Sequence, residues 1–467
     1  MIPDEEGLFP YDLVLDPAKR YFLFIGEARH DPLNPFMREA LERRTGQAMD
    51  YVAVIPDVSG CRVPRNTLVV NPKAGNLFSR TGFMIKSPLT AREFAAAVSA
   101  SATVRDLVHA LVRDQGQVFV HVAESVPELT LRRIPGVRLI GPDGEVASMW
   151  NNRLYQLRML RDLVPQIEHR YCRSIEEASE ALGELLPRWP QGVCVMKESA
   201  EDEAGYFVAQ NPSDMALKCS GVKSPAFLYR HVPHEHAPTV LGVTAGEDDV
   251  FIAAVADRQM ERGVFCGASY PSVLPEHVLT EVREHARMVG KVLGGSGYRG
   301  VFGCDFIVDP GGAVHFMEVN ARKHGAALEM CCTLESALPA GAPSLADLEL
   351  SAVFENRLPD NAVELTRAME GLFWKTRNVR APRDVVAEDG PEGPKDVRAL
   401  FRHVLSRGAG HGMIILEPPA RACLIGKGGL LGRVVAVAGD PAYLAGDIEL
   451  GRQILLASCQ EARRPPS

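Results

Sequence analysis

Two kinds of hydrophobic pattern alternate through the first part of this chain. Short runs of β-branched and aromatic residues at 21–25, 51–55 and 117–122 predict strands. Between them, apolar residues three or four positions apart predict helices, one of which begins in a capping box, Thr90-x-x-Glu93. Strands that alternate with helices in this way are typical of an α/β fold.

The middle of the chain predicts a second unit. The sequence Gly-Pro-Asp-Gly at 141–144 is a strong turn signal, and a helix is predicted after it over residues 148–163. The clearest helix is predicted over residues 276–293, where apolar side chains recur on one face. Two predicted strands, 301–308 and 313–320, follow this helix.

The last part of the chain has a different pattern. Beyond Ser344 we predict a long helical segment that leads to a Gly- and Pro-rich loop at 389–394, followed by two strands and a final helix. These patterns divide the chain into three predicted domains. They are an N-terminal α/β domain over residues 1–145, a central region over 146–345 and a C-terminal α+β extension over 346–467.

The composition excludes several classes of protein. Among 467 residues, 46% are hydrophobic and 24% are charged, which is ordinary for a folded globular protein. The net charge of −8 argues against nucleic acid or a membrane surface as a partner. No apolar stretch reaches the roughly 18 residues of a membrane span. The first residues are acidic, and the ten cysteines include no Cys-x-x-Cys pair, so we expect a cytoplasmic protein with reduced thiols.

Residues 297–322 contain the clearest candidate site. The sequence Asp-Pro-Gly-Gly at 309–312 predicts the turn of a β-hairpin. Glu318 and Asn320 lie on one face of the second strand, and Asp305 lies opposite them if the turn sets the usual register. Carboxylates this close repel each other unless a cation neutralises them. The pattern therefore predicts a magnesium site that bridges nucleotide phosphates; the alternative is a surface hairpin whose acids are solvated.

The same residues resemble a known family. Gly-x-x-Gly-x-x-Gly-x-Asp-Phe at 297–306, followed by Glu-x-Asn-x-Arg at 318–322, is similar to the C-terminal nucleotide signature of the ATP-grasp carboxylate–amine ligases. The resemblance implies an ATP-grasp fold behind an N-terminal α/β domain, with ATP and Mg²⁺ as cofactors. It also implies that Asp305, Glu318 and Asn320 bind the metal and that Arg322 faces the transferred phosphoryl group or the acyl phosphate.

Other elements of the family lie upstream in the expected order. The strand 193–197 resembles the one that ends in a phosphate-binding lysine, and residues 228–232 resemble the hinge whose backbone contacts adenine. The loop 198–205 stands in place of a Gly-rich flap but has one glycine and three consecutive acids. The resemblance assigns nucleotide contacts to Arg153, Lys197, Glu198, Tyr229, Arg230, His231 and Val232, and a role at the γ-phosphate to Arg258 as well as Arg322.

The whole layout looks most like the pheganomycin-type peptide ligases. The resemblance implies an enzyme of peptide antibiotic biosynthesis that activates a small carboxylic acid as an acyl phosphate and joins it to the amino group of a peptide, with release of ADP and phosphate. It also implies that the C-terminal extension packs on the active-site groove. One alternative is a ligase whose nucleophile is a single amino acid or a small amine. Another, prompted by the acidic flap, is a non-catalytic ATP-binding module. The sequence leaves a homodimer open.

Overall fold

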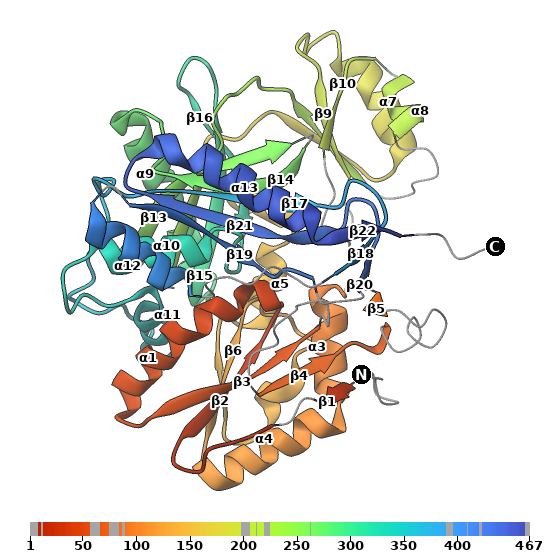
Figure 1. The fold of residues 1–467 in the computed structure, drawn as a ribbon. Helices are drawn as coiled ribbons and strands as arrows, with labels where there is room; N and C mark the ends of the chain where they lie inside the picture. The colour runs from red at the N-terminus through yellow and green to blue at the C-terminus, as the bar shows by residue number, and fades with distance from the viewer. Residues whose placement is uncertain are drawn as a thin grey trace.

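The computed structural model describes most of the chain as α-helices and four β-sheets (Figure 1). The described residues are 8–10, 13–56, 66–73, 84–85, 89–197, 206–211, 213–218, 225–261, 263–388, 396–408, 410–419 and 423–462. The helices among them are α1 Asn34–Thr45, α3 Ala91–Ala100, α4 Ala102–Gln115, α5 Gly144–Trp150, α6 Arg153–Met159, α7 Ile175–Leu185, α8 Ser213–Lys218, α9 Glu276–Gly295, α10 Ala327–Ala337, α11 Leu345–Glu355, α12 Val397–Arg407 and α13 Leu444–Ala457, with 3-10 turns η1 Ala28–Leu33, η2 Thr130–Arg133 and η3 Pro441–Tyr443.

The N-terminal sheet has the order β1-β4-β3-β2-β6-β7, and all its strands except β1 are parallel to their neighbours. Its strands are β1 Leu8–Pro10, β2 Arg20–Ile25, β3 Met49–Ile55, β4 Thr67–Val70, β6 Val118–Val122 and β7 Val137–Ile140. The alternating side chains of β2 are buried on both faces: Phe22 packs with α1, and Leu23 packs with α3 and α4. The predicted α/β pattern of this part is confirmed.

A small antiparallel sheet with the order β10-β9-β11-β8 carries the segments that resemble the lysine strand and the hinge. Its strands are β8 His169–Cys172, β9 Val193–Lys197, β10 Tyr206–Ala209 and β11 Ala226–Arg230. One face packs on α7. On the other face, Phe227 and Tyr229 pack with Leu157 of α6 and Ile307. The small sheet is thereby fixed against the large sheet.

The large antiparallel sheet has eight strands in the order β16-β15-β12-β13-β14-β17-β21-β19. Its strands are β12 Pro238–Gly246, β13 Asp249–Glu261, β14 Val264–Tyr270, β15 Gly300–Val308, β16 Val314–Asn320, β17 Phe373–Arg380, β19 His411–Leu416 and β21 Leu430–Ala438. β17, β21 and β19 come from the last part of the chain, yet they continue the sheet that contains the predicted hairpin. Short strands β5 Met84–Ile85, β18 Val385–Ala387, β20 Cys423–Ile425 and β22 Cys459–Glu461 form the fourth sheet.

Several predicted elements are confirmed and two are wrong. The hairpin is present as β15 and β16, the long helix as α9, and Thr90 caps α3 in a capping box with Glu93. The helix predicted over 148–163 is two helices, α5 and α6, because Asn152 leaves the helix and its side chain caps the first turn of α6. The long helix predicted beyond Ser344 ends at Glu355, and β17 and β18 follow it.

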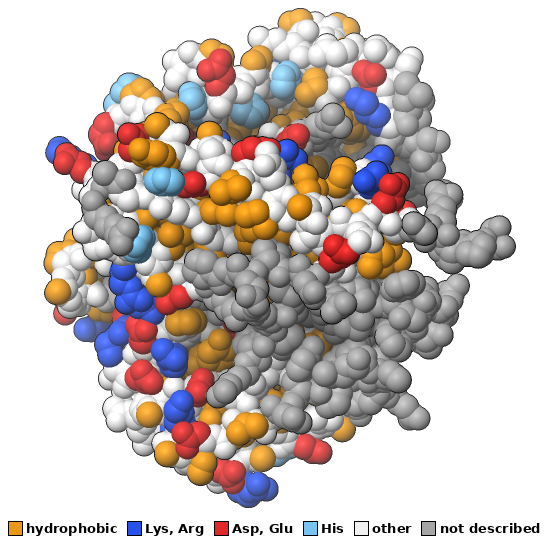
Figure 2. Space-filling model, in the orientation of Figure 1, with side chains coloured by type: hydrophobic (Ala, Val, Ile, Leu, Met, Phe, Trp, Pro, Cys, Tyr) orange, Lys and Arg blue, Asp and Glu red, His pale blue; other side chains and the backbone are white. Residues whose placement is uncertain are grey.

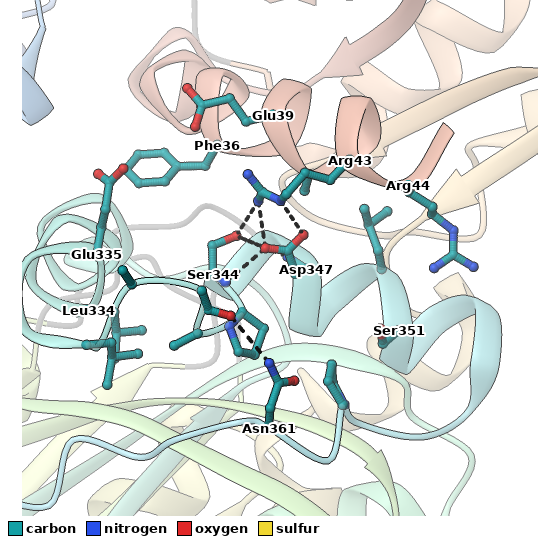
Figure 3. Close-up of a pocket in the computed structure, with 18 of the residues that line it drawn as sticks. Phe36, Glu39, Arg43, Arg44, Leu334, Glu335, Ser344, Asp347, Ser351 and Asn361 are labelled. Atoms are coloured by element: carbon teal, nitrogen blue, oxygen red, sulfur yellow. Dashed lines mark hydrogen bonds and ion pairs between the residues drawn. The ribbon is translucent and has the colours of Figure 1, made fainter. Parts of the chain in front are cut away.

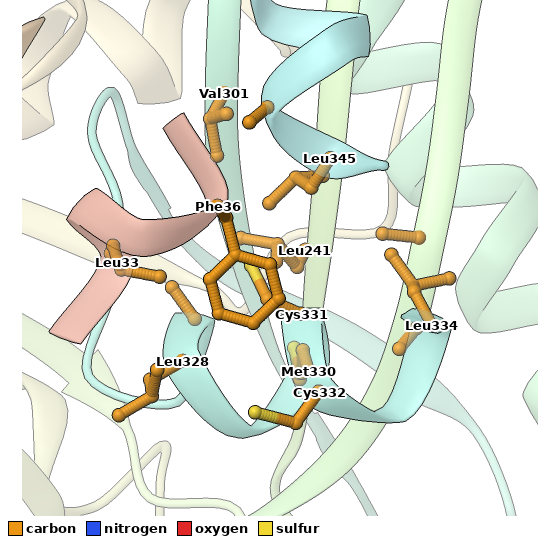
Figure 4. Close-up of a cluster of buried hydrophobic side chains, with 14 of the residues drawn as sticks. Leu33, Phe36, Leu241, Val301, Leu328, Met330, Cys331, Cys332, Leu334 and Leu345 are labelled. Atoms are coloured by element: carbon orange, nitrogen blue, oxygen red, sulfur yellow. The ribbon is translucent and has the colours of Figure 1, made fainter. Parts of the chain in front are cut away.

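The N-terminal unit and the large sheet share one hydrophobic core. Leu33 and Phe36, from the start of the N-terminal unit, pack in the same cluster as Leu241 of β12 and Val301 of β15 (Figure 4). α10 lies beside them and contributes Cys331 and its neighbours to the cluster. Because this cluster spans both units, burial of apolar surface holds them in a fixed relation.

Ion pairs and a buried charged group add to this junction. Arg43 of α1 contacts Asp347 of α11 at 2.6 Å, and acidic and basic side chains mix over this side of the surface (Figure 2). Deeper in the junction, Lys323 is 7% exposed and donates to Glu349 and to the carbonyl of Val122 at the end of β6. The loop that follows β16 is therefore tied to the N-terminal sheet.

No single described helix is long and apolar enough to cross a membrane. One bent pair, α3 with α4 at 68°, passes that test by length and composition together, and its apolar side chains are buried in the N-terminal core. The eight cysteines among the described residues are all free thiols.

We expect Gly303→Ala to destabilise the protein. A Cβ at Gly303 in β15 would lie 2.4 Å from the His324 ring, so the substitution should lower the free energy of unfolding by about 1–3 kcal/mol. The control is Gly183→Ala in α7, where nothing lies within 4 Å, and which should raise that free energy by about 0.5–1 kcal/mol. Urea unfolding measures both; equal midpoints for Gly303→Ala and the parent chain would contradict the packing.

Candidate active site

A β-bulge brings the two predicted metal-binding carboxylates together. Phe306 of β15 pairs with Phe316 of β16, but the next residue, Asp305, pairs with Glu318, so the intervening Met317 has no partner in β15. The extra residue places Asp305 and Glu318 directly opposite each other on one face of the hairpin. Like charges in that position are unfavourable, so the arrangement requires a cation close by.

Two arginines from distant elements supply positive charge to this pair. Arg258 of β13 donates to Asp305 Oδ2 at 2.7 Å and lies 3.6 Å from Glu318 Oε1. Arg153, the first residue of α6, donates to Glu318 Oε2 at 3.2 Å. Burial by itself would lower the pKa of Arg153, but the neighbouring Tyr229 and Glu318 raise it above its ordinary value. The two acids and two arginines together carry no net charge.

The oxygen atoms of this cluster fit a hard cation. Asp305 is 4% exposed, and its Oδ1 has no hydrogen-bond partner among the described residues. The Asn320 amide nitrogen donates to Asp305 Oδ2 at 3.0 Å, so this side chain lies beside the carboxylate. Across the described part of the chain, no three His, Cys, Asp or Glu side chains converge. A metal at this cluster would be held by two carboxylates and one amide, with water or phosphate oxygens completing its coordination.

The predicted hinge lies beside this cluster. Tyr229 of β11 is buried, and the Arg153 guanidinium lies over its ring at 5.6 Å. Burial raises the pKa of Tyr229 to about 12, so its hydroxyl stays protonated. Arg153 therefore contacts both the hinge and the carboxylate pair, which brings two of the predicted site elements together.

The remaining hinge residues lie at the end of β11. Arg230 contacts Glu168 at 3.4 Å, and the backbone N–H of His231 donates to the carbonyl of Gly192. Val232 is buried, and its carbonyl lies 2.8 Å from His234 Nδ1. None of these three side chains has a recorded contact with the carboxylate pair, in keeping with a segment that was predicted to act through its backbone.

Two predicted residues are described only in part or not at all. Lys197 is the last residue of β9, where its backbone pairs with Ala226 of β11. Glu198 and the rest of the predicted flap lie outside the described residues. Their assigned contacts stay predictions.

Arg322 contacts the N-terminal unit, and its predicted role at the transferred phosphoryl group stays a prediction. It lies in the loop after β16, and its Nε is 3.7 Å from Oε2 of Glu124, which follows β6 of the N-terminal unit. Arg322 therefore stands at the junction of the two units, beside the metal cluster in sequence and next to the N-terminal sheet in space.

A cavity of about 660 Å³ lies elsewhere, between α1 and the α10–α11 connection (Figure 3). Phe36 and Leu334 give it an apolar wall, and Arg43 and Asp347 lie at its edge. None of the predicted site residues lines it. The candidate active site is therefore defined by its side-chain chemistry and not by this cavity.

Comparison with known proteins shows which enzymes this chain resembles. No family model matches the chain. A formate-dependent phosphoribosylglycinamide formyltransferase from Syntrophotalea carbinolica is 24% identical over 49% of this chain and 56% of the relative. An L-propargylglycine–L-glutamate ligase from Streptantibioticus cattleyicolor is 33% identical over 19% of this chain and 18% of the relative. A butirosin acyl-carrier protein–L-glutamate ligase from Niallia circulans is 26% identical over 43% of this chain and 49% of the relative. The chain thus spans from a fifth to about half of these relatives' lengths.

Solved structures share the whole architecture. An N5-carboxyaminoimidazole ribonucleotide synthetase in complex with ADP matches 96% of this chain and 99% of its own, with a TM-score of 0.58 and 13% identity. The biotin carboxylase domain of a single-chain bacterial carboxylase matches 94% and 89%, with a TM-score of 0.55 and 17% identity. The chain shares the ATP-grasp fold of these enzymes. The predicted ATP-grasp fold is confirmed.

Sequence patterns missed one part of this candidate site. The side chains of Asn151 and Gln156 hydrogen-bond to the backbone of β16, next to Glu318 and Asn320. The continuous helix predicted over 148–163 gave these polar residues no partner other than solvent. The available signal was the Asn-Asn pair at 151–152, because asparagine favours helix ends over helix interiors.

We expect Arg258→Ala to lower the free energy of unfolding by about 3 kcal/mol, because it leaves the buried Asp305 carboxylate without its nearest cation. Adding Asp305→Ala removes that charge, so the double variant should be more stable than Arg258→Ala alone. The control is Arg283→Ala, whose partner Glu276 is exposed and whose loss should cost less than about 1 kcal/mol. Urea unfolding of the parent chain, these three variants and Asp305→Ala tests this; additive losses for Arg258→Ala and Asp305→Ala would show that the pair does not interact.

Proposed function

We propose that this chain is an ATP-dependent ligase that joins a carboxylic acid to an amine and releases ADP and phosphate. The observation that carries the proposal is the bulged pair of Asp305 and Glu318, with Asn320 beside it. Two carboxylates opposite each other repel and lower the stability of the fold. We therefore expect such a pair where it serves a function. A magnesium ion bound there would neutralise both acids and join them to the oxygens of a nucleotide phosphate.

The other residues of the cluster are suited to handling phosphate charge. Arg258 and Arg153 already contact the two carboxylates, so they would supply positive charge to phosphates bound at this cluster. Lys197, at the end of β9, is proposed to approach from the small sheet. As the γ-phosphoryl moves to the acid, cations around it stabilise the charge that develops on its oxygens.

Arg322 is proposed to act on the acid side of the reaction. It follows β16, which carries Glu318 and Asn320, and it contacts Glu124 of the N-terminal unit, which lies just past the carboxyl end of β6. In open α/β sheets, ligands bind beyond the carboxyl ends of the strands, where the strand order reverses. The N-terminal sheet reverses between β2 and β6, the strand that Glu124 follows. Arg322 is thus well placed to orient the acid as it forms an acyl phosphate, which the amine then attacks.

For the substrates we propose a small carboxylic acid and the amino group of a peptide, as in the pheganomycin-type peptide ligases. Two relatives with ligase in their names also name L-glutamate, which makes this amino acid the first acid to test. The formyltransferase relative makes formate a second. The alternative is a single amino acid as the nucleophile. Measuring turnover with an amino acid and with peptides of increasing length distinguishes the two.

The full chain incubated with ATP, Mg²⁺, L-glutamate or formate and a mixture of peptides should release ADP, together with an amide product visible by mass spectrometry. Glu318→Gln should reduce turnover by at least about 100-fold if transition-state charge is stabilised there. AMP and pyrophosphate as products would contradict the phosphoryl-transfer mechanism. Tight ATP binding without ADP release for any acid and amine would instead support a non-catalytic ATP-binding module.

Arg258 and a metal ion would both contact the Asp305 carboxylate, so they should compete for its charge. We expect Arg258→Gln to bind Mn²⁺ in the absence of nucleotide about tenfold more tightly, equivalent to about 1.4 kcal/mol, while its turnover of ATP falls. Electron paramagnetic resonance of free Mn²⁺ measures the affinity, with Arg283→Gln on α9 as the control. Weaker Mn²⁺ binding by Arg258→Gln would show that Arg258 and the metal do not compete for this carboxylate.

A further inference from the structure

β16 carries two of the three predicted metal ligands, yet it is an edge strand of the large sheet. An edge strand has a row of backbone N–H and C=O groups without a strand partner. It can therefore shift its register or lose a bulge more readily than a central strand. The functional arrangement of Asp305 and Glu318 depends on a bulge in this strand. The outer edge of β16 thus bears directly on the geometry of the site.

The segment 151–166 occupies that outer edge without forming a strand of its own. The N–H of Phe316 donates to the carbonyl of Pro165 at 2.7 Å. Arg153 donates to the carbonyl of Met317, the bulged residue, at 3.2 Å. At the far end, the N–H of Ala321 donates to Asn151 Oδ1 at 3.0 Å.

Gln156 lies at the centre of this edge and contacts both backbone groups of one residue. Its Oε1 accepts from the N–H of Val319 at 2.9 Å, and its Nε2 donates to the carbonyl of Val319 at 2.8 Å. The same Nε2 donates to the carbonyl of Trp150 at 2.6 Å. Gln156 is 3% exposed, so these bonds are shielded from water. A primary amide matches the paired donor and acceptor that a neighbouring strand would offer.

We propose that Gln156 is a positioning residue that fixes the bulged register of β16 and thereby holds Glu318 and Asn320 toward Asp305. Val319 lies between these two ligands in the strand, so a side chain that fixes its backbone sets the direction of both. Without the bulge, Asp305 would pair with Met317, and Glu318 would point to the opposite face of the hairpin. The inference rests on the metal site of the proposed function.

The test is Mn²⁺ binding by the full chain, measured by electron paramagnetic resonance well below the melting temperature. Gln156→Met has nearly the same volume but loses all three hydrogen bonds, and it should weaken Mn²⁺ binding at least tenfold. Gln166→Met is the control: this side chain, from the same segment, donates only to the carbonyl of Leu157 and should leave the affinity unchanged. A purely structural role for Gln156 would lower the melting temperature of Gln156→Met while its Mn²⁺ affinity stayed at the parent value.

A second variant covers the case in which Gln156→Met does not fold. Asn151→Ala removes one hydrogen bond at the end of the same edge and should weaken Mn²⁺ binding about threefold. Unchanged affinity in Asn151→Ala, or in folded Gln156→Met, would overturn the positioning role. Asp305→Asn and Glu318→Gln separate the two proposals. If both bind Mn²⁺ like the parent chain, the metal site itself is wrong; if they lose binding and Gln156→Met does not, only the positioning role is wrong.

Discussion

The repulsion between Asp305 and Glu318 is the constraint on which the candidate site depends. A hairpin without the bulge would separate the two carboxylates onto different faces, and a bulge at Met317 places them opposite each other. That choice requires Arg258 and Arg153 as counter-charges and requires support along the free edge of β16. Elements as distant in the chain as α6 and β13 therefore contribute to a site whose proposed metal ligands all lie in one hairpin.

The sequence predicted this hairpin well because its parts are close along the chain. Alternation put Glu318 and Asn320 on one face, and the turn at 309–312 placed Asp305 near them. The arginines and amides that complete the site lie far away in sequence. The roles of Asn151 and Gln156 were missed because the predicted helix ran through the break between α5 and α6. The side chains at that break form long-range hydrogen bonds with β16 and the residue after it, and a local sequence pattern does not reveal such bonds.

The end of the chain shows the same limit. Residues beyond Glu355 were predicted as helical, but β17 pairs with β14 and continues the large sheet. That pairing is possible because Gly267 of β14 approaches the backbone of Thr376 so closely that a Cβ would lie 2.0 Å from its carbonyl oxygen. The need for glycine at this position is evident only from the completed sheet, because the residues near Gly267 in sequence do not indicate its partner strand.

The loop after β16 connects the carboxylate cluster to the N-terminal unit. Lys323 is buried between Glu349 and the end of β6, although replacing a buried ion pair with apolar groups often costs no stability. The pair is better understood as fixing one geometry: it holds the loop, and with it Arg322, against Glu124. β16 is thus held at its outer edge by Gln156 and beyond its last residue by Lys323. A strand fixed at both places would keep the proposed metal ligands and Arg322 at one constant separation, which the proposed phosphoryl transfer between two bound substrates would require.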